Sequence, residues 1–372
     1  MGHKKLVMRR QLLEYICCPV SGSSLDLYPF EMTSSGQSVD VRFGVLKSRE
    51  GGYLYPIIEG VPSLVIRGLP PWFLHKFAER LVEVRGQPTD DRPRIHDEDW
   101  SFSREWETFY ENDVQTTWGW TSEERLKMFF QETNLEPQHF RDALVCDAGC
   151  GNGLLTEKIA SLGAQVIGVD YSTSVYHAEA RRKSDNIHYI RADLQFPPLK
   201  PASFDVIISN GVLHHTPSTR HTFSRVASLV KTDGRFYLWL YRRSGDFKHR
   251  LLQLREALIR PICSRMPPSI KSLIVHVDAA ILWGAQILFA RRRCTFSELL
   301  VGSYDSLTPR FAWQHHTPIE VASWFFENGF CAPSLTHWDN PNGFGMVAIK
   351  HPQQDTPGVN FGKHQVAKRF FS

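Results

Sequence analysis

The stretch "LVCDAGCGNGLLTEKIA" at residues 144–160 decides the fold of this chain. An apolar run leads into Asp147, three glycines follow at alternate positions, and apolar residues at helical spacing come after them. This pattern predicts a buried strand, a tight loop and a helix. Glycines in such a loop let the backbone approach a ligand closely at the helix start. We therefore expect a ligand site over Gly149, Gly151 and Gly153.

Strand and helix patterns alternate along the chain from this stretch onward. Strands are expected at residues 143–148, 164–170, 186–193, 204–210, 234–241, from about 331, and at 345–350. Alternation of this kind implies right-handed crossovers and a parallel sheet covered by helices on both faces. The turn signal "DNPNG" at residues 339–343 predicts a hairpin before the last strand. The sequence thus predicts an α/β, doubly wound, Rossmann-like sheet of seven strands with an antiparallel last strand.

Length and composition predict a folded chain with a small additional module. The chain has 372 residues, of which 42% are hydrophobic, enough for a main domain and a smaller one. The polar stretch at residues 85–100 marks a boundary. We expect a β-rich N-terminal module at 1–68, a linker and aromatic lid segment at 69–119, a main domain at 120–350 with a helical cap insertion at 242–316, and a tail at 351–372.

Seven cysteines form neither a CxxC pair nor a disulfide framework. An odd number at irregular spacing favours a reducing compartment, and the N-terminal residues lack the pattern of a secretory signal. We expect a cytoplasmic location.

Four motifs, in order, resemble those of class I S-adenosylmethionine-dependent methyltransferases of the type 11 kind. They are "VCDAGCGNG" at 145–153, "VIGVDYS" at 166–172, "IRADLQFPPL" at 190–199 and "FDVIISNGVLHH" at 204–215. A dinucleotide site is the alternative, but its fingerprint has a glycine where Leu154 stands and no acid before the loop. The resemblance implies S-adenosyl-L-methionine as cofactor and no metal.

The resemblance also implies roles for individual residues. Asp147 would help position the methionine part of the cofactor, Asp170 would accept hydrogen bonds from both ribose hydroxyls, and Asp193 would accept from the adenine amino group. Tyr171 and Leu194, which follow two of these acids, and Asn210 at the end of the fourth strand would complete the cofactor site. Each position also has a purely structural interpretation, as a helix cap, a turn former or a loop residue.

Two adjacent histidines follow the fourth expected strand. Methyl transfer is an in-line displacement that depends largely on positioning, but a hydroxyl acceptor must lose a proton, and a histidine with a near-neutral pKa suits that step. His214 and His215 are therefore the candidate catalytic residues, with packing as the alternative. For His315 and His316 we favour a loop before Thr317, which is expected to cap a helix.

A segment before the first strand is rich in aromatic residues. Its rings could form an apolar wall or a cage for the sulfonium cation, and an amphipathic helix packed on the sheet is the alternative. The residues are Trp106, Phe109, Tyr110, Trp118 and Trp120.

The N-terminal module resembles the small Trm112-like family, which derives from a zinc ribbon. The resemblance rests on "LLEYICCPVSGSSLDL" at 12–27 and "YPIIEGVPSLV" at 55–65. Ser21 stands where the second cysteine of the family's CPxC motif would be, whereas tetrahedral zinc needs about four ligands. We expect the fold without the metal, serving as a stability module, a cis-acting scaffold or a docking surface.

The cap is strongly basic. Residues 242–293 hold eleven Lys and Arg, including Arg291, Arg292 and Arg293, against Asp246, Glu256 and Asp278, whereas the whole chain is only +4. Such charge predicts peripheral contact with an anionic membrane. A buried cap helix and a nucleic-acid contact are the alternatives.

The predicted function is methyl transfer to a small-molecule or lipid-like acceptor. An RNA or translation-factor methyltransferase is one alternative, although "NGVL" at 210–213 departs from the [DN]PPY type of motif that grips planar nitrogens. A non-catalytic cofactor-binding scaffold is the other, and the intact first three motifs argue against it.

Overall fold

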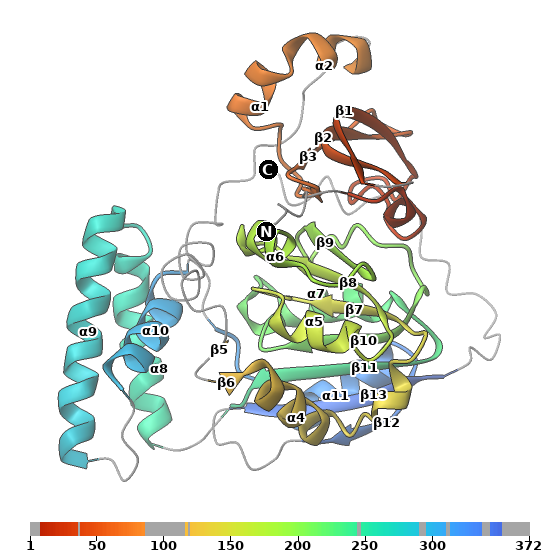
Figure 1. Cartoon of the computed structure of the whole chain (residues 1–372). Helices are drawn as coiled ribbons and strands as arrows, with labels where there is room; N and C mark the ends of the chain where they lie inside the picture. Colours follow the sequence, from red (N-terminus) through yellow and green to blue (C-terminus); the bar gives the residue numbers. More distant parts are fainter. Residues whose placement is uncertain are drawn as a thin grey trace.

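Three sheets organise the part of the chain that the structure describes (Figure 1). The computed structural model describes residues 8–35, 38–85, 116–117, 120–243, 247–289, 295–309, 313–336 and 343–351. Within these ranges, no helix is both long enough and apolar enough to cross a membrane.

The main sheet has seven strands, as predicted. They are β7 (Leu144–Ala148), β8 (Gln165–Asp170), β9 (Ile187–Arg191), β10 (Phe204–Asn210), β11 (Val230–Tyr241), β12 (Phe330–Leu335) and β13 (Gly343–Lys350). Their order is β12-β13-β11-β10-β7-β8-β9. The strands from β7 to β11 pair in parallel, and β13 pairs antiparallel with β11 and β12. This confirms the predicted doubly wound sheet with an antiparallel last strand.

Helices cover both faces of the main sheet. On one face lie α4 (Ser122–Thr133), α5 (Leu154–Ala160) and α6 (Ser174–Arg181), and on the other lie α7 (Thr219–Ala227) and α11 (Pro318–Glu327). Val145 and Val166 pack toward the first group, whereas Cys146 and Ile167 pack toward the second. Both faces are apolar because successive residues of a buried strand point to opposite sides.

A four-stranded antiparallel sheet precedes the main sheet. It is formed by β1 (Leu25–Ser35), β2 (Ser38–Ser48), β3 (Leu54–Ile58) and β4 (Val61–Pro62). Two short helices, α1 (Pro71–Lys76) and α2 (Ala78–Arg85), pack on it through Phe73, Phe77 and Leu81, which contact Phe43 and Val45. Residues 71–85, predicted as part of the linker and lid segment at 69–119, therefore pack on the N-terminal sheet. The predicted domain boundaries stay predictions.

The N-terminal module is docked on the edge of the main sheet at β9. The amide of Leu64 donates to the carbonyl of Arg191 at 2.8 Å, so the chain after β4 runs beside the end of β9. A 3-10 helix, η1 (Arg10–Glu14), and the residues beside it place Leu12 and Ile16 in the same core as α7 and α11. The module thus covers an edge strand that would otherwise expose its hydrogen-bonding groups.

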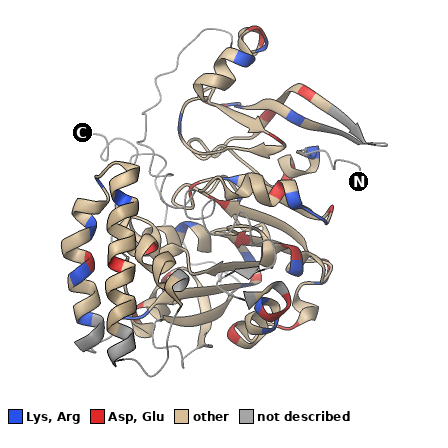
Figure 2. Ribbon diagram, turned by 60° about the vertical axis from the view of Figure 1, so that its left-hand side comes forward, with Lys and Arg blue, Asp and Glu red and all other residues tan. Residues whose placement is uncertain are grey.

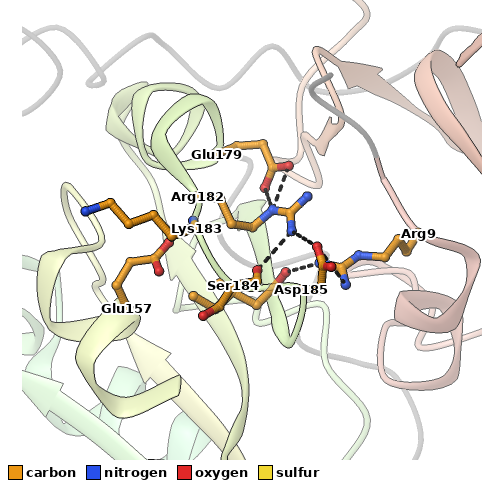
Figure 3. Close-up of polar contacts among 8 residues, drawn as sticks. Arg9, Glu157, Glu179, Arg182, Lys183, Ser184 and Asp185 are labelled. Carbon is orange, nitrogen blue, oxygen red and sulfur yellow. Dashed lines mark hydrogen bonds and ion pairs between the residues drawn. The ribbon is translucent and has the colours of Figure 1, made fainter. Parts of the chain in front are cut away.

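Ion pairs reinforce this contact below the module (Figure 3). Arg9 donates from Nη2 to the carbonyl of Ile187 at 2.9 Å and lies 4.0 Å from Asp185. Arg182, which follows α6, donates to Glu179 at 3.0 Å and to Asp185 at 3.2 Å. Because Arg182 and Glu179 are both buried, their pairing offsets the cost of removing two charges from water.

The predicted cap contains three helices at one side of the main sheet (Figure 1). They are α8 (Phe247–Cys263), α9 (Pro268–Phe289) and α10 (Phe296–Leu307). Cys263 and Val275 pack against Tyr304 and Leu307 in a small core.

Several predicted features lie outside the described residues. These are Trp106, Phe109, Tyr110, Trp118, Arg291, Arg292, Arg293, residues 339–342 of the predicted turn at 339–343 and residues 352–372 of the predicted tail at 351–372. Trp120 lies in β6 (Trp120–Thr121), which pairs with β5 (Thr116–Thr117) just before α4.

Candidate active site

The site predicted from the sequence lies where β7 and β10 meet. The chain runs outward from β7 through β8 to β9 and then returns to the other side of β7 as β10. In an open α/β sheet, ligands bind beyond the carboxyl ends of the strands at such a switch point. The glycine loop follows β7, and Asn210 ends β10. Neighbouring strands therefore deliver both predicted motifs to the same edge of the sheet.

The three glycines of the loop all have positive φ, which is 97° at Gly149, 53° at Gly151 and 77° at Gly153. A Cβ at Gly149 would lie 2.1 Å from the Val212 side chain, and one at Gly153 would lie 2.4 Å from the Tyr189 hydroxyl. Packing therefore requires two of the three glycines, which the sequence could not show.

The amides of these glycines are bonded within the protein. The Gly149 amide donates to the Val169 carbonyl at 2.7 Å, and that of Gly153 donates to the Cys150 carbonyl at 2.9 Å. The Gly151 amide donates to Asp170 at 2.9 Å. The glycine loop therefore has a fixed backbone shape, and a ligand can approach this backbone closely.

Asp170 ends β8 with a carboxylate that neighbouring groups orient. Oδ2 accepts from the Gly151 amide, and Oδ1 accepts from the amide and the hydroxyl of Ser172 at 2.9 and 2.7 Å. Each carboxylate oxygen can accept more than one hydrogen bond. The side chain is therefore held as an acceptor beside the glycine loop.

Asp147, in β7, is almost fully buried at 5% exposure. Its Oδ2 accepts from the Thr156 hydroxyl at 2.6 Å. Burial, with a further contribution from the charge of Asp170, raises the pKa of Asp147 to about 6. The charge of Arg125 offsets only part of this effect. A buried carboxyl with a raised pKa favours a cationic ligand group, because a cation would offset the remaining cost of ionising it.

Asp193 forms a turn after β9. Its Oδ1 accepts from the amide of Gln195 at 2.8 Å, and burial raises its pKa. Leu194 beside it is buried. The structure thus shows the turn-forming role, and the roles of Asp193 and Leu194 toward adenine stay predictions.

Tyr171 contacts a residue that the sequence did not indicate. Arg67, from the N-terminal module, donates to the Tyr171 hydroxyl at 3.3 Å and lies 5.7 Å from the centre of its ring. Arg191 donates to the Tyr171 carbonyl at 3.0 Å. The module therefore borders the predicted cofactor site directly. In the sequence, Arg67 is a single arginine after the apolar run at 61–66, and nothing in that pattern indicates this contact.

His214 and His215 lie in η4 (Leu213–His215), after β10. Burial lowers the pKa of His215 to about 3 and, aided by neighbouring histidines, lowers that of His214 well below its usual range. Neither histidine therefore has the near-neutral pKa expected of a catalytic base. Within the described chain, neither ring nitrogen of His214 has a hydrogen-bond partner.

Aromatic rings surround these histidines. The His214 and Tyr241 ring centres lie 4.0 Å apart, and Trp313 lies 4.8 Å from Tyr241 and 5.6 Å from His215. Gln314, which the sequence did not single out, donates to the carbonyl of Thr216 at 2.6 Å. The segment before α11 is therefore fixed against the end of β11 and forms an aromatic wall.

His315 and His316 belong to the loop before α11, as predicted. The amide of His316 donates to the Tyr241 carbonyl at 3.0 Å, and the Thr317 hydroxyl accepts from the Glu320 amide at 3.2 Å as the expected helix cap.

The side-chain amide nitrogen of Asn210 is buried and has no hydrogen-bond partner in the described part of the chain. A polar ligand group bound at this edge of the sheet would satisfy it.

Hydroxyl groups fill the place of the missing cysteine in the N-terminal module. The Ser21 hydroxyl lies 2.9 Å from that of Ser23 and 3.2 Å from that of Ser48, and the Cys18 thiol lies 3.2 Å from the Tyr55 hydroxyl. In the described ranges, no group of three or more His, Cys, Asp or Glu could hold a metal ion. The absence of zinc stays a prediction.

The comparisons with known proteins agree with this architecture. Residues 146–238 match the family model of a methyltransferase domain. A ubiquinone biosynthesis O-methyltransferase of Coxiella burnetii is 34% identical over 125 residues, which are 32% of this chain and 50% of that protein. An uncharacterized methyltransferase of Mycobacterium tuberculosis is 37% identical over 91 residues, 24% of this chain and 46% of that protein. The chain spans about half the length of the curated relatives it matches.

Among solved structures, an S-adenosylmethionine-dependent methyltransferase from Mesorhizobium loti has a TM-score of 0.41 and 18% identity, over 63% of this chain and 100% of that one. A likeness at this level carries no information about the acceptor. The domain match agrees with the enzyme class and the cofactor expected from the motifs, and it covers residues 146–238, about a quarter of the chain.

Proposed function

We propose that the whole chain transfers a methyl group from S-adenosyl-L-methionine to a small-molecule or lipid-like acceptor. The observation that carries the proposal is the oriented carboxylate of Asp170 beside the glycine loop, at the switch point of the sheet. This arrangement suits the two hydroxyls of a ribose, since both carboxylate oxygens are fixed in direction.

The residues present fit the proposed cofactor. Asp147 would hold the cationic ammonium of the methionine part, Asp170 the ribose, and the unpartnered amide of Asn210 a polar group of cofactor or acceptor. When bound, the cofactor supplies an electrophilic methyl group on a sulfonium. The protein's contribution is to hold that methyl in line with the acceptor atom and to exclude water.

The acceptor class is inferred from the aromatic wall and one relative. Tyr241 and Trp313 form an apolar wall next to His215, as expected where an apolar acceptor binds. The relative from Coxiella burnetii is named for O-methylation in ubiquinone biosynthesis, and we propose an acceptor of similar chemistry, small and at least partly apolar. Neither the RNA or translation-factor alternative nor the scaffold alternative is favoured by an observation here.

We propose that His214 and His215 mainly shape the acceptor site and make only a small contribution as bases toward a bound hydroxyl acceptor. With pKa values lowered by burial, both imidazoles are neutral at pH 7. A neutral imidazole can accept a proton, but one with a strongly lowered pKa is a weak base. Positioning then supplies most of the rate, and the histidines mainly shape the wall.

We propose that the Trm112-like module acts as a scaffold in cis. Its chain lies along β9 through the Leu64 amide, and its Arg67 contacts Tyr171. Both contacts stabilise the loops on the predicted cofactor side.

We further propose that the protein is cytoplasmic and that its basic cap makes peripheral contact with membranes. If the cap binds nucleic acid instead, that result would replace the proposed membrane contact.

The deciding experiment supplies purified protein with methyl-labelled cofactor and separate lipid, small-molecule and RNA fractions of a cell extract. We expect label in the lipid or small-molecule fraction. The Asp170→Ala variant should transfer none, and Glu79→Ala, which removes an exposed carboxylate of α2, should match the unmodified protein. Label confined to RNA or to protein would contradict the proposal.

A further inference from the structure

Two helices of the cap carry an apolar face that nothing in the described chain covers. On α8, Leu251, Leu254, Leu258 and Ile262 are 51–64% exposed, and on α9, Ile270, Leu273, Val277 and Ile281 are 44–64% exposed. Within each helix these residues follow one another at intervals of three or four, which places them on one side. We call these eight residues the cap stripe.

The cap stripe is not needed to hold the helices together. The opposite sides of α8 and α9 make the small core with α10, through Cys263 and Val275. There Arg255 also donates to Asp278 at 2.7 Å. Because α10 contacts both helices on that side, the stripe lies on the side away from it.

The charges around the cap stripe are of one sign. Between residues 250 and 285, the only carboxylates are Glu256 and Asp278, and both are buried. Arg250 and Arg265 are exposed in the same range, and further basic residues lie at partly buried positions. Figure 2 shows Lys and Arg along these two helices, which stand at the margin of the molecule.

We propose that the cap stripe docks on the surface of an anionic membrane. Exposed apolar side chains at helical spacing, flanked by Lys and Arg and without exposed acids, are the features of a helix that lies in a membrane interface. Anionic lipid headgroups attract the basic residues, and the apolar side chains enter the boundary with the acyl chains. A second copy of the chain fits less well, because stacking the two faces would bring like charges together.

Docking through this surface would also serve the acceptor site. The indole nitrogen of Trp313 donates to the carbonyl of Asp305 in α10 at 3.1 Å, so the cap is joined to the aromatic wall. A lipid-soluble acceptor could then pass from the membrane toward Tyr241 and His215. This last step rests on the proposed function, whereas the docking itself does not.

The test is sedimentation with vesicles in the absence of cofactor and acceptor. Vesicles of equal parts phosphatidylglycerol and phosphatidylcholine are compared with phosphatidylcholine alone. We expect binding to the anionic vesicles, at least tenfold weaker binding to the neutral ones, and a loss of at least tenfold in a variant that changes Leu254, Leu258, Leu273 and Val277 to Gln. Since no methyl transfer is measured, failure here removes the proposed membrane contact and leaves the proposed methyl transfer untouched.

The matched control changes two apolar residues elsewhere that are even more exposed, Val82→Gln and Ile319→Gln, at 75% and 85%. It should bind vesicles like the unmodified protein. Cofactor affinity by calorimetry shows whether the stripe variant is folded. If the stripe variant is not folded, a second variant with Arg250→Glu and Arg265→Glu tests the proposal instead. Its reversed charge should abolish binding to anionic vesicles.

Three results would overturn the proposal. The first is unmodified protein that stays in solution with anionic vesicles. The second is undiminished vesicle binding by the folded stripe variant, or by the charge variant. The third is self-association without vesicles that the stripe variant loses, which would make this face a contact between copies.

Discussion

Lowering the pH should weaken cofactor binding through Asp147. Its carboxyl is 5% exposed and accepts a hydrogen bond from Thr156 at 2.6 Å. Burial raises its pKa to about 6 from the ordinary value of 3.8. If the carboxylate holds the cofactor's ammonium group, binding requires the ionised form. At pH 7.5 nearly all molecules have it, whereas at pH 5 only about one in ten does.

The expected loss of cofactor affinity is therefore about tenfold between pH 7.5 and pH 5, or about 1.4 kcal/mol. The free energy of unfolding should change in the opposite sense. A carboxyl whose pKa is higher in the folded state contributes stability below pH 3.8, and this is lost as the pH rises through 6, by about 3 kcal/mol in all.

Calorimetry at pH 5, 6 and 7.5 measures the affinity, and urea unfolding at the same values measures the stability. Asp147→Asn keeps an acceptor for Thr156 but cannot ionise, so it should bind weakly at every pH and lose this part of the pH dependence. Glu79→Gln, at an exposed carboxylate of α2, should keep the unmodified profile. An unchanged pH profile in Asp147→Asn would refute the reasoning.

Four further predictions concern the cofactor site and the module. Asp170→Ala should weaken cofactor binding at least about a hundredfold by calorimetry, because two charge-assisted hydrogen bonds are lost. Gly149→Ala should lower the free energy of unfolding by about 2–4 kcal/mol in urea, since its Cβ would lie 2.1 Å from Val212 at a φ of 97°. Arg67→Ala should weaken cofactor binding about tenfold by calorimetry through the lost contact with Tyr171, while Arg49→Ala has no effect. Metal analysis should find no stoichiometric zinc; one zinc per chain would contradict this.

Local patterns were sufficient for the main sheet. Apolar runs of strand length and helices with recognisable caps determined the element order, and the capping role of Thr317 followed from its position before an apolar helix. The helices at 71–85 were missed because they are six and eight residues long. Over that length, helical periodicity is too short to distinguish a helix from a loop. Their stability comes from contacts with Phe43 and Val45, about 30 residues earlier in the chain.

Properties that depend on burial could not be predicted in the same way. The sequence placed His214 and His215 after the right strand, but their pKa values follow from the rings packed around them. The glycines of the loop were found, yet only the structure shows that Val212 and Tyr189 leave no space for a side chain at two of them. The sequence showed the charge of the cap, but which apolar residues face outward depends on how three helices pack.

The two appended parts contact different strand ends at the same edge of the main sheet. Arg67 of the N-terminal module contacts Tyr171 just beyond β8, on the side where the ribose is proposed to lie. Trp313, joined to the cap, packs against Tyr241 and His215 beyond β11 and β10, on the side proposed for the acceptor. The carboxyl ends of parallel strands share one edge of the sheet, so each part can influence one substrate without contacting the other. The module is therefore expected to act on cofactor affinity and the cap on delivery of the acceptor.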